Sequence, residues 1–239
     1  MNGSKSVYCR TYQWIMRLGC YALPWRQPKL LEGAGALAQL PGVVAARGCR
    51  SLLVVTDARL LSLGLLDPLL AGLEALGIRT AVYSNVMPNP TIDNVEEALS
   101  LYKEHQCDSL LAFGGGSSMD CAKACGARVV RPRKSVSRMR GLFKVLHRLP
   151  PFFAVPTTAG TGSETTVAAV ITDSRTHHKY AINDISLVPH VAVLDPELTK
   201  GLPGEITATT GLDALTHAVE AYIGRSNTGN TRRWAREAV

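Results

Sequence analysis

The sequence of 239 residues lacks any apolar run long enough to cross a bilayer. Its longest runs, such as Leu52–Val55 and Leu63–Leu66, are far shorter than the roughly 20 residues that a membrane helix needs. The N-terminal stretch also lacks the continuous apolar core of a secretory signal, because Gln13, Arg17 and Pro24 interrupt it. We therefore expect a cytoplasmic protein that has no membrane partner.

The chain also lacks a cysteine framework. It has six cysteines but no Cys-x-x-Cys pair, which favours free thiols over disulfides. Cys121 and Cys125 have the spacing of one helix face, yet no further Cys or His stands at ligand spacing beside them. Free thiols are the preferred interpretation of this pair, and a metal site is the alternative.

Aromatic residues are scarce, at 6%, although the net charge is +7. Much of that charge lies between Arg131 and Arg148, where a nucleic-acid surface is conceivable. Within this run Phe143 is the one aromatic residue available to stack on a base. A solvated face of helix and loop is the preferred interpretation, so we expect no nucleic-acid partner.

Strand-like and helix-like segments alternate along most of the chain. Strands are expected at Leu52–Thr56, Thr80–Tyr83, Ser109–Phe113, Phe152–Val155, Val167–Thr172 and Val191–Leu194. Helices are expected at Leu60–Leu76, Ile92–His105 with Thr91 as its cap, Ser118–Arg128 and Thr207–Ile223. This order predicts an α/β fold with a mostly parallel, Rossmann-like sheet. The predicted domains are an apolar N-terminal arm at 1–27, an α/β domain at 28–200, and the start of an incomplete helical domain at 201–239.

The segment Gly114-Gly115-Gly116-Ser117-Ser118 joins an expected strand to an expected helix. Glycine lets the backbone approach a phosphate closely, and the free N–H groups of the following helix attract an anion. The segment departs from the usual dinucleotide fingerprint, because Met119 stands at the third glycine position. By itself it predicts a ligand that carries phosphate, with a tight turn as the alternative.

Pro156–Glu164 forms a second loop of this kind, with four hydroxyl side chains and two glycines after a strand. Hydroxyls can donate to phosphate, ribose or adenine, although a purely structural loop is possible. Asp57 ends the first expected strand. Its carboxylate can accept bonds from ribose hydroxyls and repel a 2′-phosphate, or it can cap the helix that starts at Ala58.

Asp213 and His217 stand four residues apart on the last expected helix. This spacing places a carboxylate and an imidazole on one face, where a divalent cation could bridge them. The pair is weak evidence alone, because a simple Asp–His contact on a solvated helix is at least as common.

Together these segments resemble the iron-containing (group III) alcohol dehydrogenase family. Gly114–Ser117, Pro156–Glu164 and Gly211–Glu220 are similar to its signatures in order and spacing, and the resemblance covers the chain from about residue 28. It implies a nucleotide-binding domain of dehydroquinate synthase-like architecture followed by an all-helical domain. The positions that match cofactor-lining residues are Asp57, Asn89, Gly115, Gly116, Ser117, Asp120, Thr157, Thr158, Thr166 and Lys179.

The resemblance also implies a metal at Asp213 and His217, with Fe²⁺ expected and Zn²⁺ as the alternative. The family's other two ligands are histidines further downstream, and no other histidine of this chain matches them. No catalytic residue beyond the metal site is identified. We therefore expect this chain to be an inactive part of a larger enzyme.

The implied activity is an NAD(P)-dependent alcohol dehydrogenase or aldehyde reductase that uses metal-assisted hydride transfer. NAD is favoured over NADP because of Asp57. The expected partners are a small alcohol or aldehyde and, for the full-length protein, a second copy or a higher homo-oligomer. Alternatives are a related glycerol dehydrogenase, a dehydroquinate-synthase-like enzyme, or a non-catalytic nucleotide-binding fragment.

Overall fold

The computed structural model describes residues 3–225 and 227–239 and divides into two compact units. One unit is Arg26–Leu202, and the other contains the segments on either side of it. The larger compact unit therefore begins at residue 26 and ends at residue 202. The domain boundaries expected from the sequence, which refer to folding units, stay a prediction.

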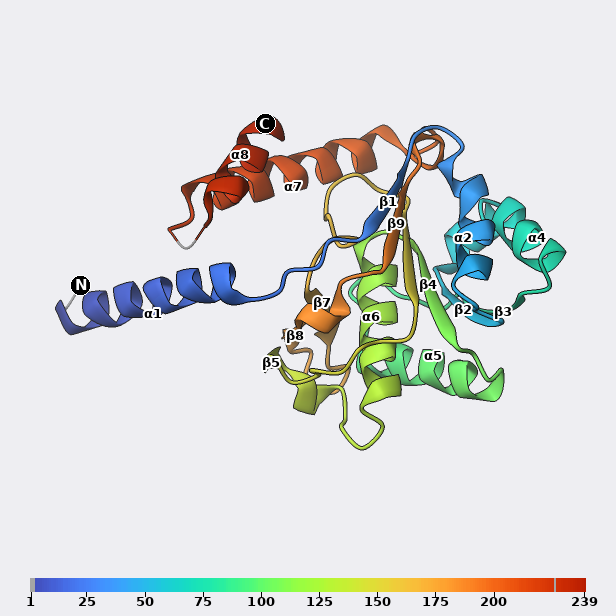
Figure 1. The fold of residues 1–239 in the computed structure, drawn as a ribbon, viewed down its shortest axis with the longest axis horizontal. Helices are drawn as coiled ribbons and strands as arrows, with labels where there is room; N and C mark the ends of the chain where they lie inside the picture. Colours follow the sequence, from blue (N-terminus) through green and yellow to red (C-terminus); the bar gives the residue numbers. More distant parts are fainter. Residues whose placement is uncertain (1–2, 226) are drawn as a thin grey trace. The chain divides into compact units, whose positions relative to one another are not determined.

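A parallel six-stranded sheet forms the centre of the larger unit, in the order β1-β9-β6-β4-β2-β3 (Figure 1). Its strands are β1 Lys29–Glu32, β2 Ser51–Val55, β3 Arg79–Tyr83, β4 Ser109–Gly114, β6 Phe152–Pro156 and β9 Val191–Leu194. The predicted α/β class with a mostly parallel sheet is confirmed. In such a sheet, the polar loops that follow the strands meet at one edge.

Side chains of each central strand point alternately into two separate cores. Leu53 and Val55 pack in one core, whereas Leu52 and Val54 pack in the other. Helices α5 (Ile92–Glu104) and α6 (Gly116–Val130) supply the first core, and α2 (Leu40–Ala46) and α4 (Asp67–Ala75) supply the second. These strands are therefore apolar throughout, because helices cover both faces of the sheet.

Helix α6 lies between this sheet and a second, smaller one. The small sheet has the order β5-β8-β7, with β5 at Gly141–Leu142, β8 at Lys179–Asn183 and β7 at Ala168–Thr172. Helix α6 packs against β4, β7 and α5. As a result its residues 121–127 are all buried, including a lysine.

The single helix expected at Leu60–Leu76 is wrong. The segment contains two helices, α3 (Ala58–Ser62) and α4 (Asp67–Ala75). Between them Gly64 has a φ of 67°, which ends the first helix, and α4 begins with Pro68 in its first turn. Proline lacks the N–H of a helix interior but fits a first turn, so Pro68 marks a helix start.

Other expected elements are found with small shifts at their ends. Asp57 caps α3 through a bond from Leu60 N of 2.9 Å, and Thr91 caps α5 through a bond from Asn94 N of 3.2 Å. Strands β1, β5 and β8 were not expected from the sequence. Short 3-10 turns complete the unit at η1 Ala36–Gln39, η2 Ser137–Met139, η3 Ile185–Leu187 and η4 Pro196–Leu198.

The other unit contains three helices among its described residues, namely α1 Gly3–Ala22, α7 Gly204–Ile223 and α8 Gly229–Glu237. The N-terminal arm is thus largely helical, and α7 packs against α8. Leu212, Leu215, Val219 and Tyr222 of α7 are all exposed. Among the helices that are described, none combines the length and the apolar character needed to traverse a membrane.

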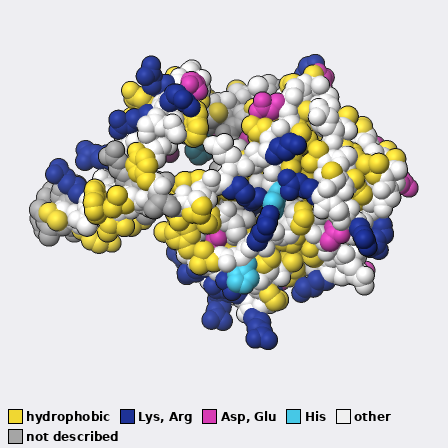
Figure 2. All heavy atoms as spheres, viewed as in Figure 1, with side chains coloured by type: hydrophobic (Ala, Val, Ile, Leu, Met, Phe, Trp, Pro, Cys, Tyr) yellow, Lys and Arg dark blue, Asp and Glu magenta, His cyan; other side chains and the backbone are white. Residues whose placement is uncertain are grey.

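The basic run at 131–148 is mostly irregular and contains the 3-10 turn Ser137–Met139 and the short strand β5. Arg131 Nε donates to the carbonyl of Val145 at 2.6 Å, and Lys134 Nζ donates to that of Lys144 at 2.7 Å. These bonds tie the two ends of the loop together. On the face shown in Figure 2, several Lys and Arg side chains gather around a histidine near the centre, while others stand singly at the edges.

Candidate functional site

The first glycine loop lies between β4 and α6, as the sequence predicts. Gly114 has a φ of 146°, and a Cβ there would stand 2.5 Å from Ser118 Oγ, so the position requires glycine. Gly115 precedes the helix and provides no side-chain cap. The main-chain N–H groups of the first turn of α6 are thereby available to an anion, and the helix dipole favours negative charge there.

The second loop follows β6 and touches the first. Thr157 N donates to the carbonyl of Gly114 at 3.1 Å. A Cβ on Gly115 would lie 3.3 Å from Thr158 Oγ1, and one on Gly116 would lie 3.1 Å from Thr161 Cγ2. The hydroxyl-rich loop therefore lies directly against the glycines, and together the two loops form a cradle of backbone N–H groups and hydroxyls.

The turn after β3 joins this cradle. Asn89 N donates to Ser117 Oγ at 3.3 Å, and Lys179 Nζ donates to Asn89 Oδ1 at 2.7 Å. Asn89 has a φ of 58°, a left-handed conformation that asparagine tolerates better than most residues. Asn89, Ser117 and Lys179, which are remote in sequence, thus form one chain of contacts.

Asp57 lies at the same edge of the sheet, because β2 pairs with β4 in parallel. One carboxylate oxygen, Oδ1, accepts the bond that caps α3, and Asp57 is partly exposed. The two roles considered for this residue are therefore compatible. The capping role is confirmed, and the role toward a ribose stays a prediction.

Asp120 and Thr166, two further predicted cofactor residues, also have side-chain oxygens bonded within the protein. Asp120 accepts bonds from Ser163 Oγ and Val170 N, both at 3.1 Å. Thr166 Oγ1 accepts a bond from Lys123 Nζ at 2.8 Å. Asp120 lies on α6 and Thr166 lies between the second loop and β7, and their predicted contact with the cofactor stays a prediction.

Ser163, one of the four hydroxyl residues of the second loop, belongs to this network together with Lys123, which the sequence analysis did not single out. Lys123 is fully buried, and its Nζ donates to Ser163 O at 2.7 Å. Burial lowers the pKa of Lys123 to about 8, while Asp120 and Glu164 oppose that shift. Burial also raises the pKa of Asp120, against the effect of Lys123. The sequence did contain a signal for Lys123, because it is a lysine within the otherwise apolar stretch Cys121–Cys125.

The two candidate metal ligands lie on α7. His217 Nε2 is 3.6 Å from Asp213 Oδ1, and both side chains are exposed. No group of three His, Cys, Asp or Glu residues able to hold a metal occurs in the described part of the chain. Two ligands do not make a catalytic metal site, which needs at least three from the protein. The described residues thus do not fit the implied metal.

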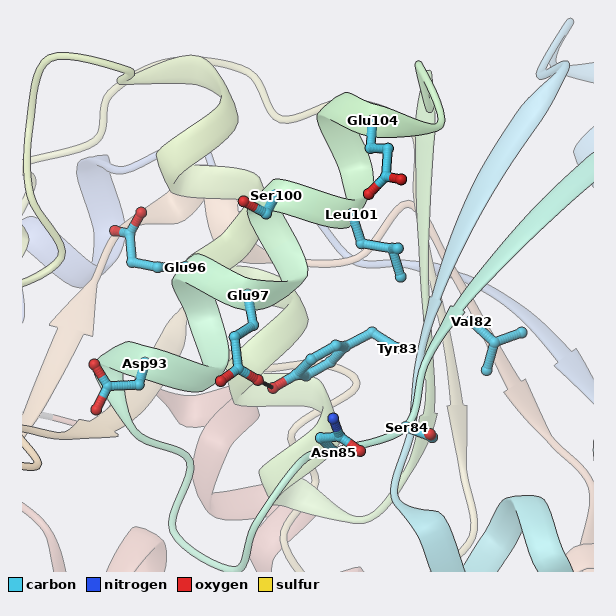
Figure 3. Close-up of a pocket in the computed structure, with 10 residues that line it drawn as sticks. All are labelled: Val82, Tyr83, Ser84, Asn85, Asp93, Glu96, Glu97, Ser100, Leu101 and Glu104. Carbon is cyan, nitrogen blue, oxygen red and sulfur yellow. Dashed lines mark hydrogen bonds between the residues drawn. The ribbon is translucent and has the colours of Figure 1, made fainter.

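A hollow beside β3 and α5 is acidic and unsuited to phosphate. Figure 3 shows its lining, in which the Tyr83 hydroxyl bonds to Glu97 at 2.7 Å. The lining residues are Val82, Tyr83, Ser84, Asn85, Asp93, Glu96, Glu97, Ser100, Leu101 and Glu104. Their carboxylates would repel an anion. We therefore place the candidate site at the two loops.

Comparisons with known proteins agree with this geometry. Residues 27–196 match the family model described as iron-containing alcohol dehydrogenase. Alcohol dehydrogenase 4 of Schizosaccharomyces pombe is 42% identical over 193 residues, which cover 81% of this chain and 46% of that protein. The chain spans about half the length of the relatives it matches.

Solved structures share the fold. A 1,3-propanediol oxidoreductase superposes with a TM-score of 0.85 at 36% identity, covering 88% of this chain and 55% of that one. A sulfoacetaldehyde reductase from Bifidobacterium kashiwanohense, in complex with NAD⁺, has a TM-score of 0.75 at 27% identity, covering 90% and 64% respectively. The family model spans most of the larger unit and includes both loops. The chain belongs to the iron-containing alcohol dehydrogenase family.

Proposed function

We propose that this chain is the nucleotide-binding part of an alcohol dehydrogenase or aldehyde reductase, and that its ligand is NAD(H). The contact between the two loops carries the proposal. Gly115 and Gly116, at the start of the long helix α6, lie against the hydroxyl-rich second loop. A side chain on either glycine would crowd that loop. This combination suits a pyrophosphate, which needs close backbone approach, free N–H groups and hydroxyl donors.

A bound nicotinamide dinucleotide would supply the carbon that accepts or gives the hydride. The chain's own residues bind and orient it. Gly115 and Gly116 with the first turn of α6 would hold the pyrophosphate, and Thr157 and Thr158 would donate to it or to the adjoining ribose. Asp57 would accept from ribose hydroxyls and disfavour a 2′-phosphate. The NAD⁺ complex of the related sulfoacetaldehyde reductase supports NAD as the ligand.

The alcohol or aldehyde substrate and the metal belong to the proposal for the whole protein. Asp213 and His217 are proposed as two of its metal ligands, with Fe²⁺ preferred to Zn²⁺. No reaction step is derived through that metal, because the described residues do not complete its site. The expectations of a homo-oligomer and of a cytoplasmic location stay predictions.

A titration of the 239-residue chain with NADH tests the nucleotide proposal. We expect saturable binding that enhances NADH fluorescence and that competing NAD⁺ reverses. This test uses the unmutated chain, so it does not depend on any role of Lys123. A chain that is folded by circular dichroism but shows no binding by fluorescence or calorimetry would refute the proposal.

A further inference from the structure

Lys123 is a buried cation surrounded by oxygen atoms of one segment. Its Nζ donates to the carbonyls of Ser163 at 2.7 Å, Thr166 at 3.0 Å and Ala168 at 2.9 Å. The hydroxyls of Ser163 and Thr166 lie within 3.2 and 2.8 Å of the same nitrogen. All five oxygens belong to the segment 163–168, which runs from the end of the second loop to the first residue of β7.

Ser163 and Thr166 lie in irregular structure before β7, whereas Ala168 is the first residue of that strand. Buried carbonyls need hydrogen-bond donors, and an irregular loop commonly finds them in side chains or water. The ammonium of Lys123 has three N–H donors, which matches the three carbonyls around it. An apolar side chain of the same length would fill the space but remove the charged donor that the three carbonyls share, which leaves Ser163 O with the longer bond of 3.3 Å from Thr166 N.

Asp120 completes the attachment from one turn earlier on α6. Its Oδ1 accepts from Ser163 Oγ and its Oδ2 accepts from Val170 N, both at 3.1 Å. Ser163 Oγ can therefore accept from Lys123 while it donates to Asp120. The carboxylate also compensates the buried positive charge, which would be very costly if it were alone.

The same helix carries the glycines of the first loop at its N-terminus. Lys123 thus joins the second loop to the element that presents the first one. Earlier in the second loop, Thr158 and Thr161 stand against Gly115 and Gly116. A shift of the second loop would carry these hydroxyls away from the pyrophosphate position.

We propose that Lys123 is a positioning residue, which fixes the second loop on α6 so that its hydroxyls are preorganised for the nucleotide. The inference rests on the proposed nucleotide function. Because Lys123 is fully buried, it would act without touching the ligand. It donates hydrogen bonds to the carbonyls at the end of the loop. The loop therefore loses little conformational entropy when the nucleotide binds.

The competing explanation is that Lys123 contributes only to the stability of the fold. Loop mobility in the folded protein distinguishes this explanation from a positioning role. Hydrogen exchange of the peptide covering residues 157–168 reports local opening of the loop in the nucleotide-free protein. The dissociation constant of NADH reports preorganisation. The free energy of unfolding reports stability.

The experiment compares Lys123→Met with Cys125→Ala. Cys125 is also fully buried on α6, but it packs in the core beside α5 and makes no bond to the loop. In Lys123→Met we expect loop exchange faster, and NADH affinity weaker, by about tenfold or more each. In Cys125→Ala we expect lower stability with both other quantities unchanged.

Ser163→Ala gives a milder test if Lys123→Met does not fold. It removes the hydroxyl that links Lys123 to Asp120, and we expect it to raise loop exchange about threefold. Unchanged loop exchange in the folded variants would overturn the role of Lys123, even if wild-type protein binds NADH. Wild-type protein that binds no NADH, although Lys123→Met accelerates loop exchange, would instead refute the nucleotide function and leave the loop attachment standing.

Discussion

Thr161 Cγ2 lies 3.1 Å from the position that a Cβ on Gly116 would occupy, although the two residues belong to different loops. Their closeness leaves no room for a larger side chain at the N-terminus of α6. Any branched residue at position 116 would displace the second loop or enter the space proposed for the pyrophosphate.

We therefore predict that Gly116→Val weakens NADH binding by about tenfold or more, because close backbone approach is lost. Gly42→Val is the control, since a Cβ at that position on α2 meets no atom within 4 Å. Fluorescence titration measures binding, and far-ultraviolet circular dichroism checks that both variants fold. Undiminished affinity in Gly116→Val would mean that the loop is structural.

Asp57→Ser separates the cap of α3 from cofactor choice. Serine is also a good N-cap, so the bond from Leu60 N is retained while the negative charge is removed. We predict that the ratio of NADPH to NADH affinity rises about tenfold or more, because repulsion of the 2′-phosphate disappears. Calorimetric titration with both nucleotides measures the ratio. The same ratio in both proteins would leave Asp57 with a capping role alone.

The 239-residue chain should not oxidise alcohols by itself. Asp213 and His217 are exposed, lie 3.6 Å apart and have no third ligand group among the described residues. We predict weak Zn²⁺ or Fe²⁺ binding that His217→Ala abolishes, and no NADH formation from NAD⁺ with primary alcohols or diols. Metal-dependent turnover that disappears in His217→Ala would show that further ligands complete the site.

His190 should make the protein sensitive to mild acid. Burial, together with the positive charges of Arg26, Arg47 and Arg148, lowers the pKa of His190 to about 4. Its Nδ1 accepts a bond from Phe152 N at 3.1 Å, which protonation there would break. Since the unfolded state binds the proton more tightly, stability is fully present above about pH 6.5 and falls as the pH drops toward 4.

We predict that wild-type protein loses on the order of 3 kcal/mol more stability between pH 7 and pH 4 than His190→Asn does. The asparagine oxygen can still accept a bond from the Phe152 amide but does not titrate in this range. Urea unfolding at the two pH values measures the difference. Parallel pH dependences would show that His190 does not control acid sensitivity.

The sequence predicted most of the local structure correctly, since each signal lies within a few residues. Apolar runs located β2, β4, β6 and β9, and Thr91 indicated the start of α5. It failed where a local pattern was ambiguous. Gly64 and Pro68 divide an apolar stretch whose helical period continues across the break. The short strand β1 has the four-residue sequence Lys-Leu-Leu-Glu, which offers little periodicity to recognise.

The strand order and the contacts within the site depend on residues far apart in the chain. β1 pairs with β9, and Lys179 donates a hydrogen bond to Asn89. No local sequence pattern predicts either contact. Asp120 and Thr166 were expected to line a cofactor, which stays a prediction, and only the structure shows that their side-chain oxygens bond to Ser163 and Lys123. Solvent access to a side chain is a property of packing, so it cannot be read from residue type alone.

The sequence by itself determined the fold class, the two polar loops at the strand ends and the pair of candidate metal ligands, because spacing and residue chemistry define each of them. Tertiary structure alone decided that the two loops touch and that Lys123 holds one of them to α6. The physical reason is burial from both sides. Helix α6 lies between two sheets, and a lysine there can stay charged only where distant carbonyls and a carboxylate converge on it.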